Sequence, residues 1–121
     1  MSAFKSLADI PALPIWTGVL ARAVEGREMT FAIVELDADA VVAQHQHANE
    51  QMGIILQGSL RFNIGDESRE LRAGDTYVIA GGMPHDAIAG PEGAVVVDVF
   101  SPVRADWRQF SPGTVKDPRW P

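Results

Sequence analysis

Turn-prone residues divide this chain into many short apolar runs, and that division constrains its fold more than any other feature. Glycine, aspartate and proline interrupt the runs, which recur at roughly 8–12-residue spacing. The runs are 19–24, 30–36, 41–47, 52–56, 59–64, 76–80, 85–89 and 94–100. No stretch has a sustained helical period, so the sequence predicts an all-β sandwich or barrel. Turns are expected between the runs, including at 57–58 and 90–93.

The pattern within the runs predicts how the strands are buried. Apolar and polar side chains alternate over 60–64, which is typical of a strand with one buried face. Both faces are apolar in 52–56 and in 95–97, so these strands are expected to be covered on both sides.

The chain has 121 residues, which favours one domain with a single core. We expect a barrel body at about 18–103, an extended arm at 1–17 and an irregular tail at 104–121. Prolines in the arm and the tail oppose regular elements of any length. Three tail aromatics need an apolar surface, either on this subunit or on a partner: Trp107, Phe110 and Trp120.

Composition narrows the classes of function. The net charge of −6 argues against broad attraction to nucleic acid or to anionic membranes. No apolar run approaches the ~20 residues of a membrane span, and no signal peptide is evident. The chain has no cysteine, so disulfides and thiolate chemistry are excluded, and we expect a cytoplasmic protein.

The three histidines stand at the edges of predicted strands. His45 and His47 are two residues apart, and on a strand that spacing points both rings to one face. His85 follows the turn-like segment 80–84. A lone histidine is usually solvated or satisfied in a core, but three at strand edges predict one site. Neutral imidazoles suit a transition metal, so we expect metal binding.

This arrangement resembles the first motif of the cupins. That motif reads His-x-His, three or four intervening residues, a glutamate, six further residues and a glycine. Here the matching residues are His45, His47, Gln51 in place of the glutamate, and Gly58.

The second cupin motif is also present, with two departures. Gly74, Gly82 and His85 match it, whereas Ala80 replaces the usual proline and Ala89 the usual asparagine. The resemblance covers most of residues 30–100. It implies a double-stranded β-helix, the jelly-roll type of β-barrel.

A closer similarity is to the KdgF-type cupins of pectin and alginate catabolism. It rests on the run 49–53 and on the segment 98–107. The resemblance implies a metal held by three histidines and one glutamine, here His45, His47, His85 and Gln51. It also implies a substrate site lined by Asp98, Phe100 and Arg104. The implied reaction converts 4,5-unsaturated monouronates to the open-chain, ketonised sugar acid.

Glu50 is the alternative to Gln51 as the fourth ligand. Alternation along an uninterrupted strand favours Gln51, because Glu50 would point to the opposite face from His47. The alternative role of Gln51 is to form only hydrogen bonds near a site that holds no ion. Four neutral ligands leave a divalent ion its full formal charge, which favours Lewis-acid chemistry over oxygen activation. The set suits Ni, Zn, Co, Mn or Fe.

The roles of the other three residues stay open. Asp98 lies in an otherwise apolar strand, and it is either a general acid–base group or part of an ion pair with Arg104. Phe100 either packs against a sugar ring or belongs to the core. Arg104 either clamps the uronate carboxylate or lies on the surface.

The leading hypothesis is a metal-dependent cupin enzyme acting on a small unsaturated uronate. The alternatives are a non-haem metal dioxygenase and a protein that binds a small acid or sugar without transforming it. We expect a small acidic sugar as the ligand, no nucleic-acid or membrane partner, and a homodimer.

Overall fold

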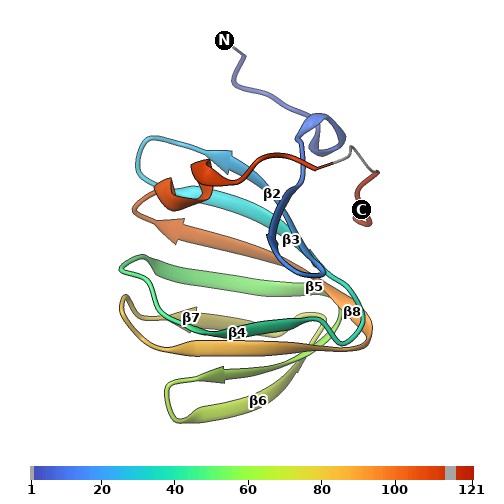
Figure 1. The fold of residues 1–121 in the computed structure, drawn as a ribbon, viewed down its shortest axis with the longest axis vertical. Coiled ribbons are helices and arrows are strands. Elements are labelled where there is room, and N and C mark those ends of the chain that lie inside the picture. The colour runs from blue at the N-terminus through green and yellow to red at the C-terminus, as the bar shows by residue number, and fades with distance from the viewer. Residues whose placement is uncertain (1, 114–116) are drawn as a thin grey trace.

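The computed structural model describes residues 2–113 and 117–121, and their regular structure is mostly antiparallel strand (Figure 1). Two short 3₁₀ turns accompany the strands. The elements are η1 (Leu7–Asp9), β1 (Leu13–Trp16), β2 (Val19–Glu25), β3 (Thr30–Leu36), β4 (Val41–His45), β5 (Glu50–Ile64), β6 (Glu67–Arg72), β7 (Thr76–Ile79), β8 (His85–Ser101) and η2 (Ala105–Gln109). The predicted all-β class is confirmed. None of the helical segments in the described ranges is long and apolar enough to cross a membrane.

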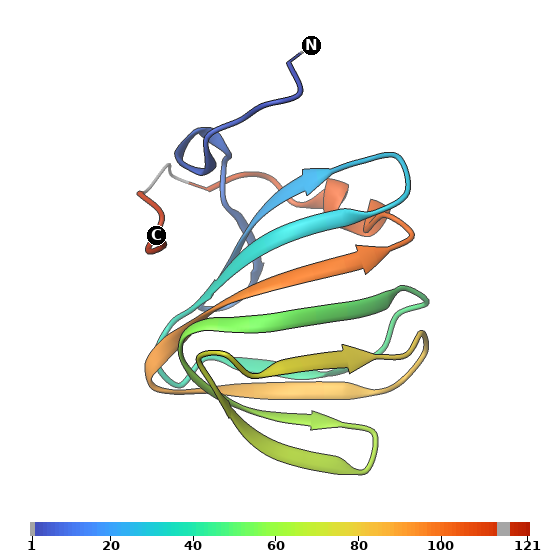
Figure 2. The same ribbon diagram turned by 180° about the vertical axis from the view of Figure 1, so that it is seen from behind.

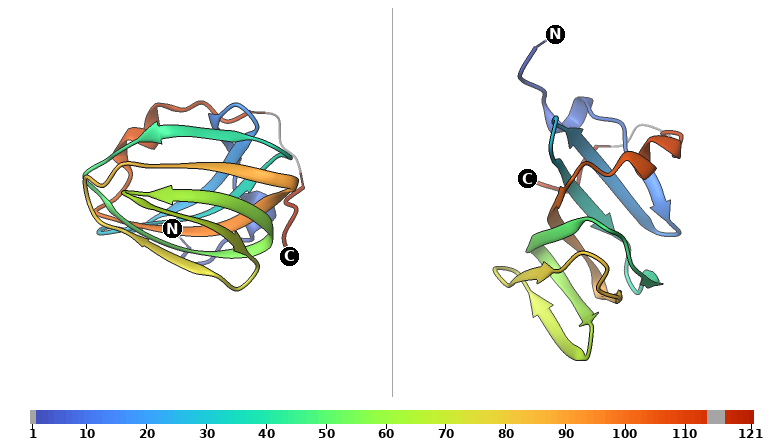
Figure 3. Two further views of the ribbon diagram at one scale, coloured as in Figure 1. Left: turned by 90° about the horizontal axis from the view of Figure 1, so that it is seen from below. Right: turned by 90° about the vertical axis from the view of Figure 1, so that its left-hand side faces the viewer.

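Two long, bent strands organise the sheet. The strand order is β1-β2-β3-β8-β5-β6, with β4 also paired to β8 and β7 to β5. One part of β8 therefore pairs with β3 and another part with β4, and β5 likewise pairs with both β7 and β6. Both long strands bend, so that the sheet folds back on itself around an interior (Figures 2 and 3).

The bends lie where the sequence predicted turns, and those two predictions were wrong. Along the β5–β8 ladder the register passes from Gly58↔Ala94 to Leu60↔Ala89. One residue of β5 therefore faces the four residues 90–93 of β8, which form a bulge rather than a turn. Gly58 has φ +73°, and a Cβ there would overlap the backbone of residue 93. The glycines bend the paired strands without ending them.

The inward-facing side chains form one apolar cluster inside the folded sheet. Its members are Val19, Ala21, Ala32, Val34, Leu36, Ile55, Leu60, Phe62, Leu71, Tyr77, Ile79, Ala87, Ala89, Ala94, Val96, Phe100 and Trp107. The prediction of burial on both faces holds for Val95 and Val96, which are 2% and 3% exposed. It was wrong for Met52, which points outward from β5 and is 51% exposed.

Parts of both ends of the chain pack against this body. The predicted arm is extended only in part, because it contains η1 and then β1, which pairs with β2. In the tail, Trp107 is buried and Phe110 packs against the apolar cluster, as the need for an apolar surface predicted. Residues 114–116 of the predicted tail lie outside the described residues.

Candidate metal centre

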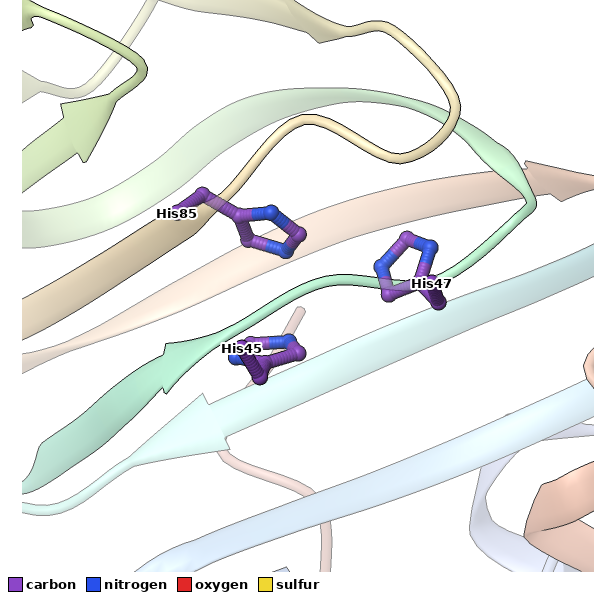
Figure 4. Close-up of side chains that lie close together, drawn as sticks. All are labelled: His45, His47 and His85. Carbon is purple, nitrogen blue, oxygen red and sulfur yellow. The ribbon is translucent and has the colours of Figure 1, made fainter.

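The strand register brings the three histidines together (Figure 4). His45 ends β4 and lies directly opposite His85, the first residue of β8. The predicted strand 41–47 is therefore two residues too long, and His47 lies in the following loop. The ring centroids of His85 are 4.3 Å from those of His45 and 4.9 Å from those of His47. One ligand atom from each ring lies within 4.8 Å of the others, so the three residues could hold a metal ion.

Backbone carbonyls fix the tautomer of each histidine. The Nδ1 atoms of His45, His47 and His85 lie 2.8, 3.1 and 2.9 Å from carbonyl oxygens. Because a carbonyl only accepts, each Nδ1 carries the proton and each Nε2 keeps its lone pair. This arrangement is typical of metal-binding imidazoles. Among the described residues, Nε2 of His85 is buried without a hydrogen-bond partner, which a metal ion would supply.

Burial favours the neutral form of His47 and His85. Removal from water lowers the pKa of His85 to about 4, and it also lowers the pKa of His47. The nearby Arg104 guanidinium acts in the same direction on both. A neutral imidazole is the form that binds a metal.

Gln51 completes the cluster from β5. Its Nε2 atom donates to Oδ1 of Asp98 at 3.0 Å, and its Oε1 atom lies 3.1 Å from Nε2 of His47. The tautomer above makes that Nε2 an acceptor, so two acceptors face each other without a proton between them. A cation bound to both atoms would satisfy them. Glu50 is exposed, whereas Gln51 is 6% exposed, although the uninterrupted strand expected from His47 to Gln51 is broken at residues 46–49.

Asp98 and Tyr77 form a buried hydrogen-bonded pair beside Gln51. The phenol of Tyr77 donates a hydrogen bond to Oδ1 of Asp98. Burial raises the pKa of Asp98 to about 6, although the hydrogen bonds from Tyr77 and Gln51 oppose the shift. Burial and the neighbouring Asp98 raise the pKa of Tyr77 well above 10, so the phenol stays protonated.

The ion-pair partner of Arg104 in the described structure is Asp106 and not Asp98. Nε and Nη2 of Arg104 donate to the two carboxylate oxygens of Asp106 at 3.0 Å each. The guanidinium carbon lies 4.7 Å from the ring centroids of both Phe100 and Trp107. Arg104 is only 9% exposed and is therefore not a surface arginine.

Asn49 ties the histidine loop to the chain that leads to Arg104. Its amide donates to the carbonyl of Pro102 at 2.6 Å and to that of Val103 at 3.2 Å. This contact holds the loop that carries His47 against the segment that carries Arg104.

One cavity of about 320 Å³ unites these groups. Its walls include every residue that the sequence placed in the site: His45, His47, Gln51, His85, Asp98, Phe100 and Arg104. Phe100 is 2% exposed, so it serves both the core and the cavity wall.

Four further residues of the cavity wall were missed by sequence reasoning as site residues: Trp16, Tyr77, Asp106 and Trp107. Trp16 lies on β1 with its ring centroid 5.3 Å from that of His45. Trp16 is far from the histidine motif in the sequence, so no local pattern indicated this contact. Asp106 and Trp107 were part of the segment used for the family resemblance, which was the available signal for them.

Comparison with known proteins agrees with this geometry. The Cupin domain family matches residues 32–100. The pectin degradation protein KdgF of Dickeya dadantii (strain 3937) is 31% identical over 81 residues, which cover 66% of this chain and 74% of that protein.

Solved structures share the fold over most of the chain. KdgF from Halomonas sp. superposes with a TM-score of 0.80 at 27% identity, over 88% of this chain and 98% of that one. An RmlC-like cupin from Shewanella frigidimarina NCIMB 400 gives a TM-score of 0.82 at 23% identity, over 88% and 96% of the two chains. The chain therefore belongs to the cupin family, and its strands form the predicted double-stranded β-helix. Within that family it is a small cupin that resembles the KdgF type.

Proposed function

We propose that this cupin is a metal-dependent enzyme that converts 4,5-unsaturated monouronates to open-chain ketonised sugar acids. The observation that carries the proposal is a single cavity lined by the His/Gln cluster, the buried Asp98 and the buried Arg104. The choice of substrate is supported by the similarity to a pectin degradation protein. Pectin is a uronate polymer, and polysaccharide lyases release unsaturated uronates from such polymers.

Four neutral side chains would hold one divalent ion, which we propose to be Ni, Zn, Co, Mn or Fe. They are His45, His47 and His85 through Nε2, and Gln51 through Oε1. When bound, such an ion supplies Lewis-acid polarisation of a substrate oxygen. Because none of the four ligands is charged, the ion keeps its full formal charge.

Asp98 is proposed to move the proton. Opening of the ring hemiacetal breaks the bond between the ring oxygen and the anomeric carbon, and the anomeric hydroxyl gives up its proton. The ring oxygen leaves as an enolate on C5, and the same proton is then delivered to C4, the other carbon of the double bond, which makes C5 a ketone. No atoms are gained or lost overall, so one group that accepts and returns a proton suffices. A carboxyl whose pKa is raised to about 6 is suited to both steps near neutral pH.

Arg104 and Phe100 are proposed to hold the substrate. Asp106 occupies the Nε–Nη2 edge of the guanidinium, while Nη1 has no hydrogen-bond partner among the described residues. The Nη1–Nη2 edge therefore remains for the uronate carboxylate. Phe100 would pack against the sugar ring from the cavity wall.

We further propose that the chain acts as one cupin domain and that two copies pair through the outer face of the sheet. Five apolar side chains there are register neighbours across five strands and are exposed in whole or part: Val24, Phe31, Val99, Met52 and Val78. Contiguous apolar rows of this kind mark association surfaces. Sedimentation of the wild type and of Met52→Glu tests the pairing, and a monomeric wild type would refute it.

A cytoplasmic location stays a prediction.

The decisive experiment incubates metal-loaded protein with unsaturated galacturonate or mannuronate monomers. Loss of the ultraviolet absorbance of the conjugated double bond should exceed the rate without enzyme. Asp98→Ala should abolish that excess while ligand binding persists. A wild-type rate equal to the background would refute the proposal, and binding without turnover would identify a non-catalytic acid-binding cupin instead.

A further inference from the structure

Tyr77 reaches its partner Asp98 across an intervening strand. Gly53 of β5 is the register partner of Tyr77 on β7 and also of Asp98 on β8. A Cβ on Gly53 would overlap the Cζ and hydroxyl atoms of the phenol. The missing side chain therefore opens the path by which the Tyr77 hydroxyl crosses β5 to the carboxylate. Only glycine leaves that path free without displacing the ring.

The contact gives the two carboxylate oxygens of Asp98 different surroundings. Oδ1 accepts both the Tyr77 hydroxyl and the Gln51 amide. Oδ2 has no hydrogen-bond partner among the described residues, and Asp98 lines the cavity. One oxygen is therefore anchored and the other is left for a ligand in the cavity.

The same contact bears on the orientation of Gln51. The amide NH₂ group needs an acceptor on the side away from the histidines, and Oδ1 of Asp98 supplies it at 3.0 Å. If that oxygen moved away, the amide NH₂ group would have no acceptor on that side, and nothing would hold Oε1 beside His47. Rotation by half a turn would then point two N–H donors at the ligand cluster, which repels a cation.

We propose that Tyr77 is a positioning residue for this site. Its hydroxyl, passing over Gly53, fixes Oδ1 of Asp98, which holds the Gln51 oxygen toward the histidines and leaves Oδ2 to exchange the substrate proton. This proposal rests on the proposed function for the last of these roles. The ligand-orienting role does not depend on the substrate.

The variant Tyr77→Phe removes only the hydroxyl and keeps the ring that packs on Phe62 at 4.7 Å between centroids. In the cobalt-loaded protein, we expect the visible absorption bands to shift and the affinity for cobalt to fall about 10-fold. With substrate, kcat should fall about 10- to 100-fold while KM changes by less than about 3-fold.

Two further variants separate positioning from simple support of the fold. In the Asp98→Ala background, Tyr77→Phe should add no further change in the cobalt spectrum or in the affinity for cobalt. Leu71→Ala, which loosens the buried core on β6, should lower the unfolding temperature but leave the cobalt spectrum unchanged.

A Tyr77→Phe protein with the wild-type cobalt spectrum and wild-type cobalt affinity would overturn the ligand-orienting role. If Tyr77→Phe shifts the cobalt spectrum and lowers the cobalt affinity equally in the Asp98→Ala background, Tyr77 does not act through Asp98. If the wild type fails to turn over unsaturated uronates, the proposed function fails, yet the cobalt measurements still decide what Tyr77 does.

Discussion

His45 and His85 lie directly opposite each other across the β4–β8 ladder, with ring centroids 4.3 Å apart. Each ring has its Nδ1 atom tied to a backbone carbonyl, so the two Nε2 atoms are free to share an ion. His85→Ala should therefore lower the affinity for a divalent metal by more than about 100-fold. The loss of a direct ligand should cost more than the loss of a residue that only orients a ligand. Titration calorimetry with cobalt or nickel measures this.

Gln44→Ala, a change at an exposed neighbour on β4, serves as the matched control and should bind metal like the wild type. The metal should also raise the unfolding temperature of the wild type, since it binds only the folded state. Equal metal uptake by His85→Ala and the wild type would contradict the site.

Substitutions at Gln51 and Glu50 provide a second test of the metal site, because Gln51 is buried beside the histidines whereas its neighbour Glu50 is exposed. Gln51→Glu replaces the amide that donates to Asp98 by a carboxylate, which places two acids in contact and halves the formal charge of a bound divalent centre. Turnover should fall about 10- to 100-fold with metal still bound. Glu50→Gln should change metal affinity by less than about 2-fold. Loss of metal in Glu50→Gln alone would make Glu50 the ligand.

Arg104 should not tolerate lysine. Lysine cannot pair with both oxygens of Asp106 or keep a planar group between Phe100 and Trp107. We expect kcat/KM on the unsaturated uronate to fall about 10- to 100-fold, mainly through KM. Arg108→Lys, at an exposed ion pair with Glu25, is the control and should retain wild-type kinetics. Similar KM values for Arg104→Lys and the wild type would remove Arg104 from substrate binding.

The Arg104–Asp106 pair also predicts how stability depends on acid. The hydrogen bonds from Arg104 hold the pKa of Asp106 below its ordinary value of 3.8. The folded state therefore favours the ionised form, so the stabilisation is complete above the unfolded-state pKa and is lost as pH falls through the lower folded-state pKa. Asp106→Asn should thus reduce stability at neutral pH and weaken its dependence on pH below about 4.

Urea denaturation at several pH values measures this effect. The same substitution in an Arg104→Gln background should have a smaller effect, because the partner is already gone. An undiminished effect there would mean that Asp106 stabilises the fold through another contact.

The family and much of the site were predictable from the sequence because they depend on local patterns. The His-x-His spacing predicted that His45 and His47 share one site, although His47 lies in the loop after β4, and alternation along β5 separates Gln51 from Glu50. These relations hold between near neighbours, so no knowledge of the fold is needed to derive them. The cupin motifs added His85 and the segment 98–104.

Other features depended on contacts between distant parts of the chain. Residues 57–58 and 90–93 have the composition of turns, but inside the folded sheet they form a bend because both flanking strands stay paired. Asp98 pairs with Tyr77 rather than Arg104 because the β7–β5–β8 register places Gly53 between them.

The sequence by itself determined which side chains can bind a metal and that the chain folds as a β-barrel, since both follow from residue type and short-range periodicity. Only the tertiary structure decided which atoms of those side chains face each other. Proton positions and amide orientation are set by partners on other strands, such as the carbonyls beside each imidazole and the Asp98 carboxylate beside Gln51. Strand register supplies those partners, and it is fixed by burial of the whole core rather than by any local pattern.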